Sequence, residues 1–416
     1  MFNEKGRINI FVKKETVAWA CFCTGIAIAF LGSLNAWFMW PLGGLYALPA
    51  GMFVLSALLL SNTMSEGFFN RKDFIIPTFA YILISIYILL IEATNINAHI
   101  VNFFHIIVFF ALFRLDTERL PRLATFLCKM MAAILCFSIP AFLLYLIGFP
   151  LPSRDAQFND GMYVFSNFGF FLIDDRFLLW FVPRFQSVFL EPGHLGTATV
   201  LLLMTQIGKW RKWYNILLLF ATFLSFSLAA YVFLVAIVFL SFWIQRKRIL
   251  SRVLLLVVLI AVVVIGSFYY NQGDNMINQL IVLRLEVEDD GKLSGDNRVT
   301  EDFQAEYEEF ITSSDVFFGR EYDNRIAGNS GYRVFIYKYG LVGFLLFCVL
   351  YSTSMLRIRN EKRAMISTII MTILTFWVRA YPLWYANFIP IYILAYFNNG
   401  LSKNQETTES PKEILT

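Results

Sequence analysis

Long apolar runs separated by short polar junctions make up most of the chain. A helix that crosses a hydrocarbon layer needs about 17–25 consecutive, mainly apolar residues. Inside such a layer every backbone amide must find a partner within its own segment, which a helix provides. The pattern therefore predicts membrane-spanning helices, which we place near residues 17–34, 37–60, 74–91, 99–113, 123–149, 193–208, 253–270 and 332–356.

Two further apolar stretches are each predicted to contain two short helices. Residues 214–244 are too long for one span and short for two, and both of their flanks are basic. Because basic flanks favour the cytoplasm, this stretch must enter the membrane and return, with a turn near Ser225 and Ser227. Residues 365–397 divide at Arg379-Ala-Tyr-Pro382. We therefore expect an all-α polytopic membrane protein with about twelve transmembrane helices.

The distribution of basic residues predicts how the chain is threaded. Alternate junctions carry Lys and Arg, whereas the short junctions at 35–36 and 92–98 carry none. Cytoplasmic loops are enriched in these residues, so both termini should be cytoplasmic and two long loops should lie outside. The expected order is helices one to five in 1–149, an outer loop at 150–192, helices six to nine in 193–270, a second outer loop at 271–331, helices ten to twelve in 332–400 and a cytoplasmic tail at 401–416.

Composition and charge agree with a membrane protein and exclude other classes. Hydrophobic residues make up 58% of the chain and charged residues 15%, where a soluble domain carries about 25% charge. The net charge of +4 follows from the cytoplasmic loops, so we expect no nucleic-acid partner. All five cysteines fall in apolar runs, which predicts packing roles and no disulfide framework.

The end of the first outer loop concentrates polar residues at the mouth of a predicted span. Arg184, Glu191 and His194 lie between Pro183 and Gly196. Charged groups at such a place cost free energy unless they are paired or hydrated, so they mark either a structural ion pair or a substrate site. Arginine can bind phosphate oxygens, and glutamate or histidine can accept a proton. A bracing ion pair and a hydrogen-bonded interface histidine remain open as alternatives.

This segment resembles the signature of bacterial O-antigen and capsule polymerases, which share a superfamily with the O-antigen ligases. The resemblance starts with Arg184-Phe185-x-Ser187-x-Phe189-x-Glu191-Pro192 and continues through the serine-containing turn Ser225–Tyr231. It covers most of residues 180–345 in the order that the family shows. The later pieces are Asp296-Asn297-Arg298, Phe317-Phe318-Gly319, Gly331-Tyr332 and Tyr339-Gly340-Leu341-Val342-Gly343.

The resemblance implies a glycosyltransferase of the bacterial plasma (inner) membrane. Such an enzyme moves a growing glycan from undecaprenyl pyrophosphate to a hydroxyl of an incoming lipid-linked repeat unit, on the outer face. Its expected partners are that lipid-linked oligosaccharide, membrane lipid, a flippase and a chain-length regulator. No acidic pair in the sequence has the spacing of a divalent-metal site, so we expect a reaction without metal or other cofactor.

The resemblance also assigns roles to particular residues. Arg184 and Arg298 match the family's two loop arginines and are the expected pyrophosphate clamps. Glu191 is the first choice for the catalytic base and His194 the second, because Asn329 stands where the ligases usually carry a histidine. That missing histidine and the two sizeable outer loops favour a polymerase over a ligase. Further substrate-binding candidates are Arg320, Arg325, Asn329, Tyr332 and Arg333.

Two alternatives to a polymerase come from different readings of the same pattern. An O-antigen ligase would transfer one glycan to a separate lipid acceptor. A transporter or flippase commonly has twelve spans with both termini inside. Transporters tend to place ionisable residues near the middle of the bilayer and to contain inverted repeats. The sequence shows no matching halves and few central charges, which favours the enzyme.

Overall fold

The computed structural model describes residues 13–64, 67–92, 96–159, 161–175, 183–245, 249–275, 277–283, 300–322, 331–356 and 362–396. Most of these residues are helical. The N-terminal part contains α1 (Lys14–Ser33), the short helix η1 (Trp37–Tyr46), α2 (Ala47–Asn62), α3 (Ile75–Glu92), α4 (Ile96–Arg114), η2 (Thr117–Arg119) and α5 (Leu120–Leu146). Helices α1 and α2 pack closely together, and α4 packs on α2.

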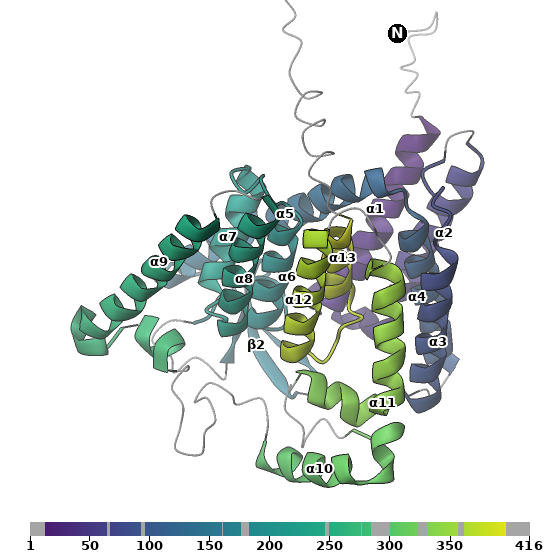
Figure 1. Cartoon of the computed structure of the whole chain (residues 1–416). Coiled ribbons are helices and arrows are strands. Elements are labelled where there is room, and N and C mark those ends of the chain that lie inside the picture. The colour runs from purple at the N-terminus through teal and green to yellow at the C-terminus, as the bar shows by residue number, and fades with distance from the viewer. Residues whose placement is uncertain are drawn as a thin grey trace, which may run out of the picture.

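The central part is built around one short, fully enclosed helix. All residues of α6 (Pro192–Met204) are buried, and α6 contacts α5, α7 (Trp213–Leu224), α8 (Leu228–Gln245) and α13 (Tyr385–Ala395). By contrast α9 (Ile249–Tyr269) points away from the bundle (Figure 1). The short helices η4 (Tyr270–Gly273) and η5 (Asn278–Val282) follow it.

The C-terminal part contains a helix that is broken in the middle. Helix α11 (Gly331–Tyr351) has φ of 64° at Gly340, so its first part lies across the end of the bundle and the rest rises along it (Figure 1). Against the first part packs a small unit, α10 (Glu301–Thr312) and η7 (Ser314–Phe317). The chain then continues through η8 (Ser352–Leu356) and α12 (Lys362–Val378) to α13.

The fold is that of a polytopic helical membrane protein. Eight helices in the described part of the chain are long and apolar enough to cross a membrane, and α6, α7 and α13 are shorter apolar helices. The two predicted divisions are confirmed, because a turn at Ser225–Ser227 separates α7 from α8 and residues 379–384 separate α12 from α13. The total of twelve spans stays a prediction.

The all-α prediction is wrong for the long loop between α5 and α6. Strands β1 (Arg154–Phe158), β2 (Tyr163–Asn167) and β3 (Leu172–Asp174) form an antiparallel sheet in that order. Phe165 of β2 is fully buried against Leu172 and Leu190, and it lies 5.6 Å from the ring of Trp40. Aromatic side chains of this loop therefore partly form the packing face of a sheet. Strand β2 and α10 lie at the same end of the bundle (Figure 1).

Candidate functional site: a buried polar cluster at the start of α6

The first turn of α6 rests on the turn between α7 and α8. Pro192 occupies the first helical position, where its missing N–H costs nothing. A Cβ atom on Gly196 would lie 2.8 Å from the Ser225 side-chain oxygen, so only glycine permits this approach. Ser225 Oγ accepts a hydrogen bond from the Ser227 N–H, and Ser227 Oγ accepts one from the Ala230 N–H at the start of α8. These contacts fix the residues just before α6 beside the turn.

Glu191, which immediately precedes α6, forms a largely buried ion pair with Arg379. The Arg379 Nη1 lies 3.4 Å from Glu191 Oε2, and Arg379 is only 8% exposed. The Tyr163 hydroxyl of β2 donates to the other carboxylate oxygen at 3.4 Å. Arg379 Nη2 lies so close to Gly193 that a Cβ atom there would be 2.1 Å away. The pair thus joins α6, the end of α12 and the sheet.

The charges around Glu191 keep its carboxylate ionised. Burial by itself raises the pKa of this group, because removal from water disfavours the charged form. The nearby His194 and Arg379, together with hydrogen bonds from Arg379 and Tyr163, lower the pKa by more than burial raises it. The net result is a pKa well below the usual range of a glutamate. Glu191 is therefore an anion that can accept a hydrogen bond at neutral pH.

His194 lies next to Glu191 in a packed aromatic environment. Its Nε2 is 3.8 Å from Glu191 Oε2, and the side chain is 6% exposed. The imidazole packs edge-on against Trp384, with ring centres 5.2 Å apart, and Trp384 in turn stacks on Tyr381. His194 is thus placed to orient the carboxylate from inside the bundle.

Arg184 also contacts the turn between α7 and α8. Its Nε donates to the Ser225 carbonyl oxygen at 3.3 Å, and the side chain is half-buried. The structure therefore brings Arg184, Glu191 and His194 to the contact between α6 and the α7–α8 turn, as their closeness in sequence suggested. Arginines at such a place can stabilise negative charge that develops on a ligand.

A second group of predicted residues braces the α10 unit. Arg320 pairs with Asp315 at 2.6 Å and Glu309 at 3.2 Å, and the hydrogen bond to Asp315 is the main cause of its raised pKa. Arg333 donates to Gln304 Oε1 of α10 at 2.8 Å. Both arginines hold protein carboxylate or amide groups, so their proposed roles toward a substrate stay predictions.

Tyr332 packs beside Trp377, with ring centres 5.2 Å apart. Arg298, Arg325 and Asn329 lie outside the described residues.

The segment between α12 and α13 connects the two groups. Arg379 turns toward Glu191, while the next two residues, Ala380 and Tyr381, pack with Phe303 and Tyr337 of the α10 and α11 cluster. In the sequence, Arg379 was identified only as part of the break between two apolar stretches. The signal for a functional role was present, because an arginine within such a stretch needs a partner.

The described residues contain no group of three His, Cys, Asp or Glu side chains that could hold a metal ion. The fold and the buried charges define a helical membrane protein with a polar site at the end of the bundle that carries β2 and α10 (Figure 1). No protein-family model, no curated protein and no solved structure matches the chain.

Proposed function

We propose that this protein is a polysaccharide polymerase of a bacterial plasma membrane. It transfers a growing glycan from undecaprenyl pyrophosphate to a hydroxyl of an incoming lipid-linked repeat unit, on the outer face. In this proposal about twelve helices enter the membrane and both termini face the cytoplasm. The observation that carries the proposal is the Glu191–Arg379 pair at the start of α6, which packs on the same α7–α8 turn that Arg184 contacts, at the end of the bundle with the sheet and α10.

The reaction makes two electrostatic demands that this cluster can meet. The bond between the sugar C1 and the pyrophosphate oxygen breaks, which leaves negative charge on the departing pyrophosphate. Arginine stabilises such charge by forked, charge-assisted hydrogen bonds. Arg184 and Arg298 fill this role in the proposal, and Arg379 adds a third cation next to Glu191.

The acceptor hydroxyl must lose a proton as the new bond to C1 forms. Glu191 is ionised, so it can accept a hydrogen bond from that hydroxyl. It takes the proton as the new bond to C1 forms, because the bonded oxygen is then strongly acidic and a weak base suffices. Arg379 and Tyr163 hold the carboxylate in one orientation, and His194 supports it from behind. In this arrangement Glu191 is the base and His194 a positioning residue.

The test is a reaction with purified protein in detergent and a polyprenyl-pyrophosphate oligosaccharide. The wild type should give a ladder of products spaced by one repeat unit, and Arg184→Ala should slow its formation by about 10²–10³-fold, as loss of one charge-stabilising donor does. Arg119→Ala is the matched control, because Arg119 pairs with Glu15 before α5. That variant should keep the ladder.

The possible outcomes separate the three functional classes. A single transfer onto a different lipid acceptor identifies a ligase and overturns the polymerase. Movement of the lipid across proteoliposomes without a new glycosidic bond identifies a transporter. If Arg184→Ala makes the same ladder as the wild type, Arg184 takes no part in the reaction.

Gly193→Ala should lower both activity and stability. The added methyl group would occupy the space of the Arg379 guanidinium, and this long side chain would have to move away from Glu191. We expect polymer formation to fall about tenfold or more, since a hydrogen bond to a charged group contributes about 1.5–3 kcal/mol. The melting temperature should fall as well, because the displaced Arg379 leaves the Glu191 carboxylate without its arginine partner. Gly266→Ala in α9, where nothing lies within 4 Å of the new methyl, is the control; equal rates for both variants would contradict the prediction.

A further inference from the structure

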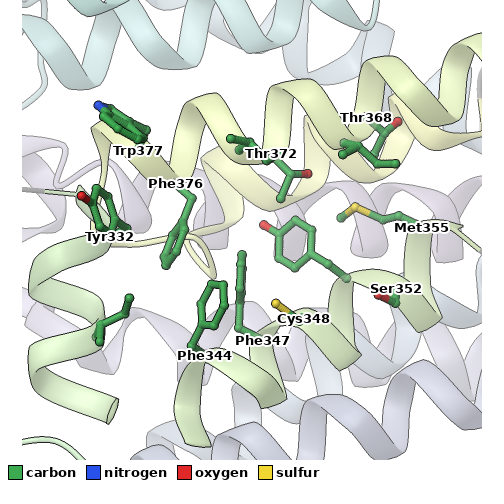
Figure 2. A pocket seen from close by; sticks show the side chains of 14 residues that line it. Tyr332, Phe344, Phe347, Cys348, Ser352, Met355, Thr368, Thr372, Phe376 and Trp377 are labelled. Carbon is green, nitrogen blue, oxygen red and sulfur yellow. The ribbon is translucent and has the colours of Figure 1, made fainter. Parts of the chain in front are cut away.

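An apolar cavity of about 350 Å³ lies between α11 and α12, outside the polar cluster. Figure 2 shows Phe344, Phe347 and Phe376 facing one another in its middle. Tyr332 and Trp377 stand at one end, and Ser352, Met355 and Thr368 at the other. The residues in its middle come from the rising part of α11 and from α12, so the cavity follows the long direction of the bundle.

The break in α11 shapes one end of this cavity. Because the chain turns at Gly340, the first part of α11 lies across the bundle and brings Tyr332 and Ile336 over the space between the helices. Gly331 fixes this arrangement, since a Cβ atom there would lie 1.9 Å from the Trp377 carbonyl oxygen. Ile373 and Trp377 on the rim are 58% and 66% exposed, so the cavity is a groove that opens sideways.

A cation lies at the end of the groove near α10. Arg333 follows Tyr332 in sequence, and its Nε lies 3.5 Å from the Tyr332 hydroxyl. This is the end that the α10 unit and the sheet share. An apolar groove at membrane depth that ends beside an arginine is complementary to an amphiphile with a hydrocarbon tail and an anionic head.

We propose that the groove between α11 and α12 binds the isoprenoid tail of the incoming lipid-linked repeat unit, with the pyrophosphate of that acceptor near Arg333. The choice of this lipid rests on the proposed function. The size of the groove favours it, because about 350 Å³ is at the lower end of ligand-site volumes and suits one chain. A polyprenyl pyrophosphate has a single tail, whereas a phospholipid has two. The rim opens to the side, so the tail enters from the lipid.

The test uses the full chain in lipid nanodiscs and a sugar-free polyprenyl pyrophosphate that carries a photoreactive diazirine in its tail. Cross-links should map to α11 and α12. Cys348→Trp and Thr372→Phe each fill the groove from one helix and should reduce labelling about tenfold, because excluding two methylene groups weakens binding by that factor. Leu345→Trp and Ile370→Phe are matched controls on the same helices that do not line the groove. They should label like the wild type.

Competition identifies the occupant. Unlabelled polyprenyl pyrophosphate should remove the cross-links, whereas phosphatidylglycerol and inorganic pyrophosphate should not. Equal competition by phosphatidylglycerol, or equal labelling of the filled and control variants, overturns the inference.

The inference and the proposed function fail separately. If the groove is labelled but no polymer forms, the polyprenyl lipid site stands and the polymerase proposal is rejected. If the wild-type protein gives a normal product ladder but α11 and α12 take up no label, the polymerase proposal stands and the groove is not the lipid site.

Discussion

Arg379→Ala should both destabilise the protein and abolish polymer formation. Without this arginine, the Glu191 carboxylate stays in a largely buried position with its arginine counter-charge removed. Breaking one partner of a buried pair costs up to about 3–5 kcal/mol. The remaining carboxylate, 23% exposed, would keep only the hydrogen bond from Tyr163 and the neighbouring His194. The catalytic carboxylate also loses the group that orients it, so we expect transfer to fall at least 10²-fold. Thermal unfolding in detergent and the ladder assay measure the two effects.

A double variant distinguishes a structural pair from a catalytic one. Glu191→Gln with Arg379→Met removes both charges at similar volume, which is often neutral for stability. We expect this variant to unfold close to the wild-type temperature and still to make no polymer. Arg119→Ala is the stability control, since its more exposed pair with Glu15 contributes at most about 1 kcal/mol. Polymer formation by the double variant would show that the pair only braces the fold.

Gly340→Ala should release the α10 unit from the bundle. Gly340 has φ of 64°, and a Cβ atom there would lie 2.3 Å from the Phe317 carbonyl oxygen. Gly319 makes the reciprocal contact, with φ of 91° and a Cβ position 2.3 Å from the Lys338 carbonyl oxygen. Backbone meets backbone here, so neither side can yield by a change of rotamer. The strained conformation alone costs about 1–3 kcal/mol, and the clash adds to it.

The expected signature is local. Displacement of Phe317–Gly319 breaks the hydrogen bond from the Arg320 N–H to the Tyr337 carbonyl oxygen, which measures 2.7 Å. Limited proteolysis should then cut near α10 at least tenfold faster than in the wild type, while the rest of the chain stays protected. Gly266→Ala, in an open helical position, should be cut like the wild type. Unchanged proteolysis of Gly340→Ala would contradict a fixed contact between the two glycines.

The helices could be predicted because their information is local. An apolar run of membrane length specifies a helix without reference to any other segment. Charge on both flanks of 214–244 was enough to place the turn between α7 and α8. The sheet depends on distant contacts instead. Strand β2 is only five residues long, and its buried Phe165 packs on Trp40, more than a hundred positions earlier.

In the candidate site, too, the residues that are close in sequence could be predicted and the distant contacts could not. Three of its residues, Arg184, Glu191 and His194, are close in sequence. Polar residues at the mouth of a span are recognisable from the sequence, because they need a partner or water there. Arg379 comes 188 positions after Glu191, so the sequence shows that it needs a partner but not which one. Arg320 and Arg333 illustrate the converse, because the fold supplies Asp315, Glu309 and Gln304 as partners for residues that we had assigned to a substrate.

Helices α6 and α13 also constrain how the chain is assembled during synthesis. They contain 13 and 11 residues, about 20 and 16 Å of helix, which is well short of a hydrocarbon layer about 30 Å thick. All residues of both helices are buried in protein. Neither segment is a stable insertion unit by itself, so each must enter the bilayer together with its neighbours. Because α13 follows α1, α5 and α6 in the chain and packs against all three, the ribosome has to synthesise α13 before the bundle can close around α6.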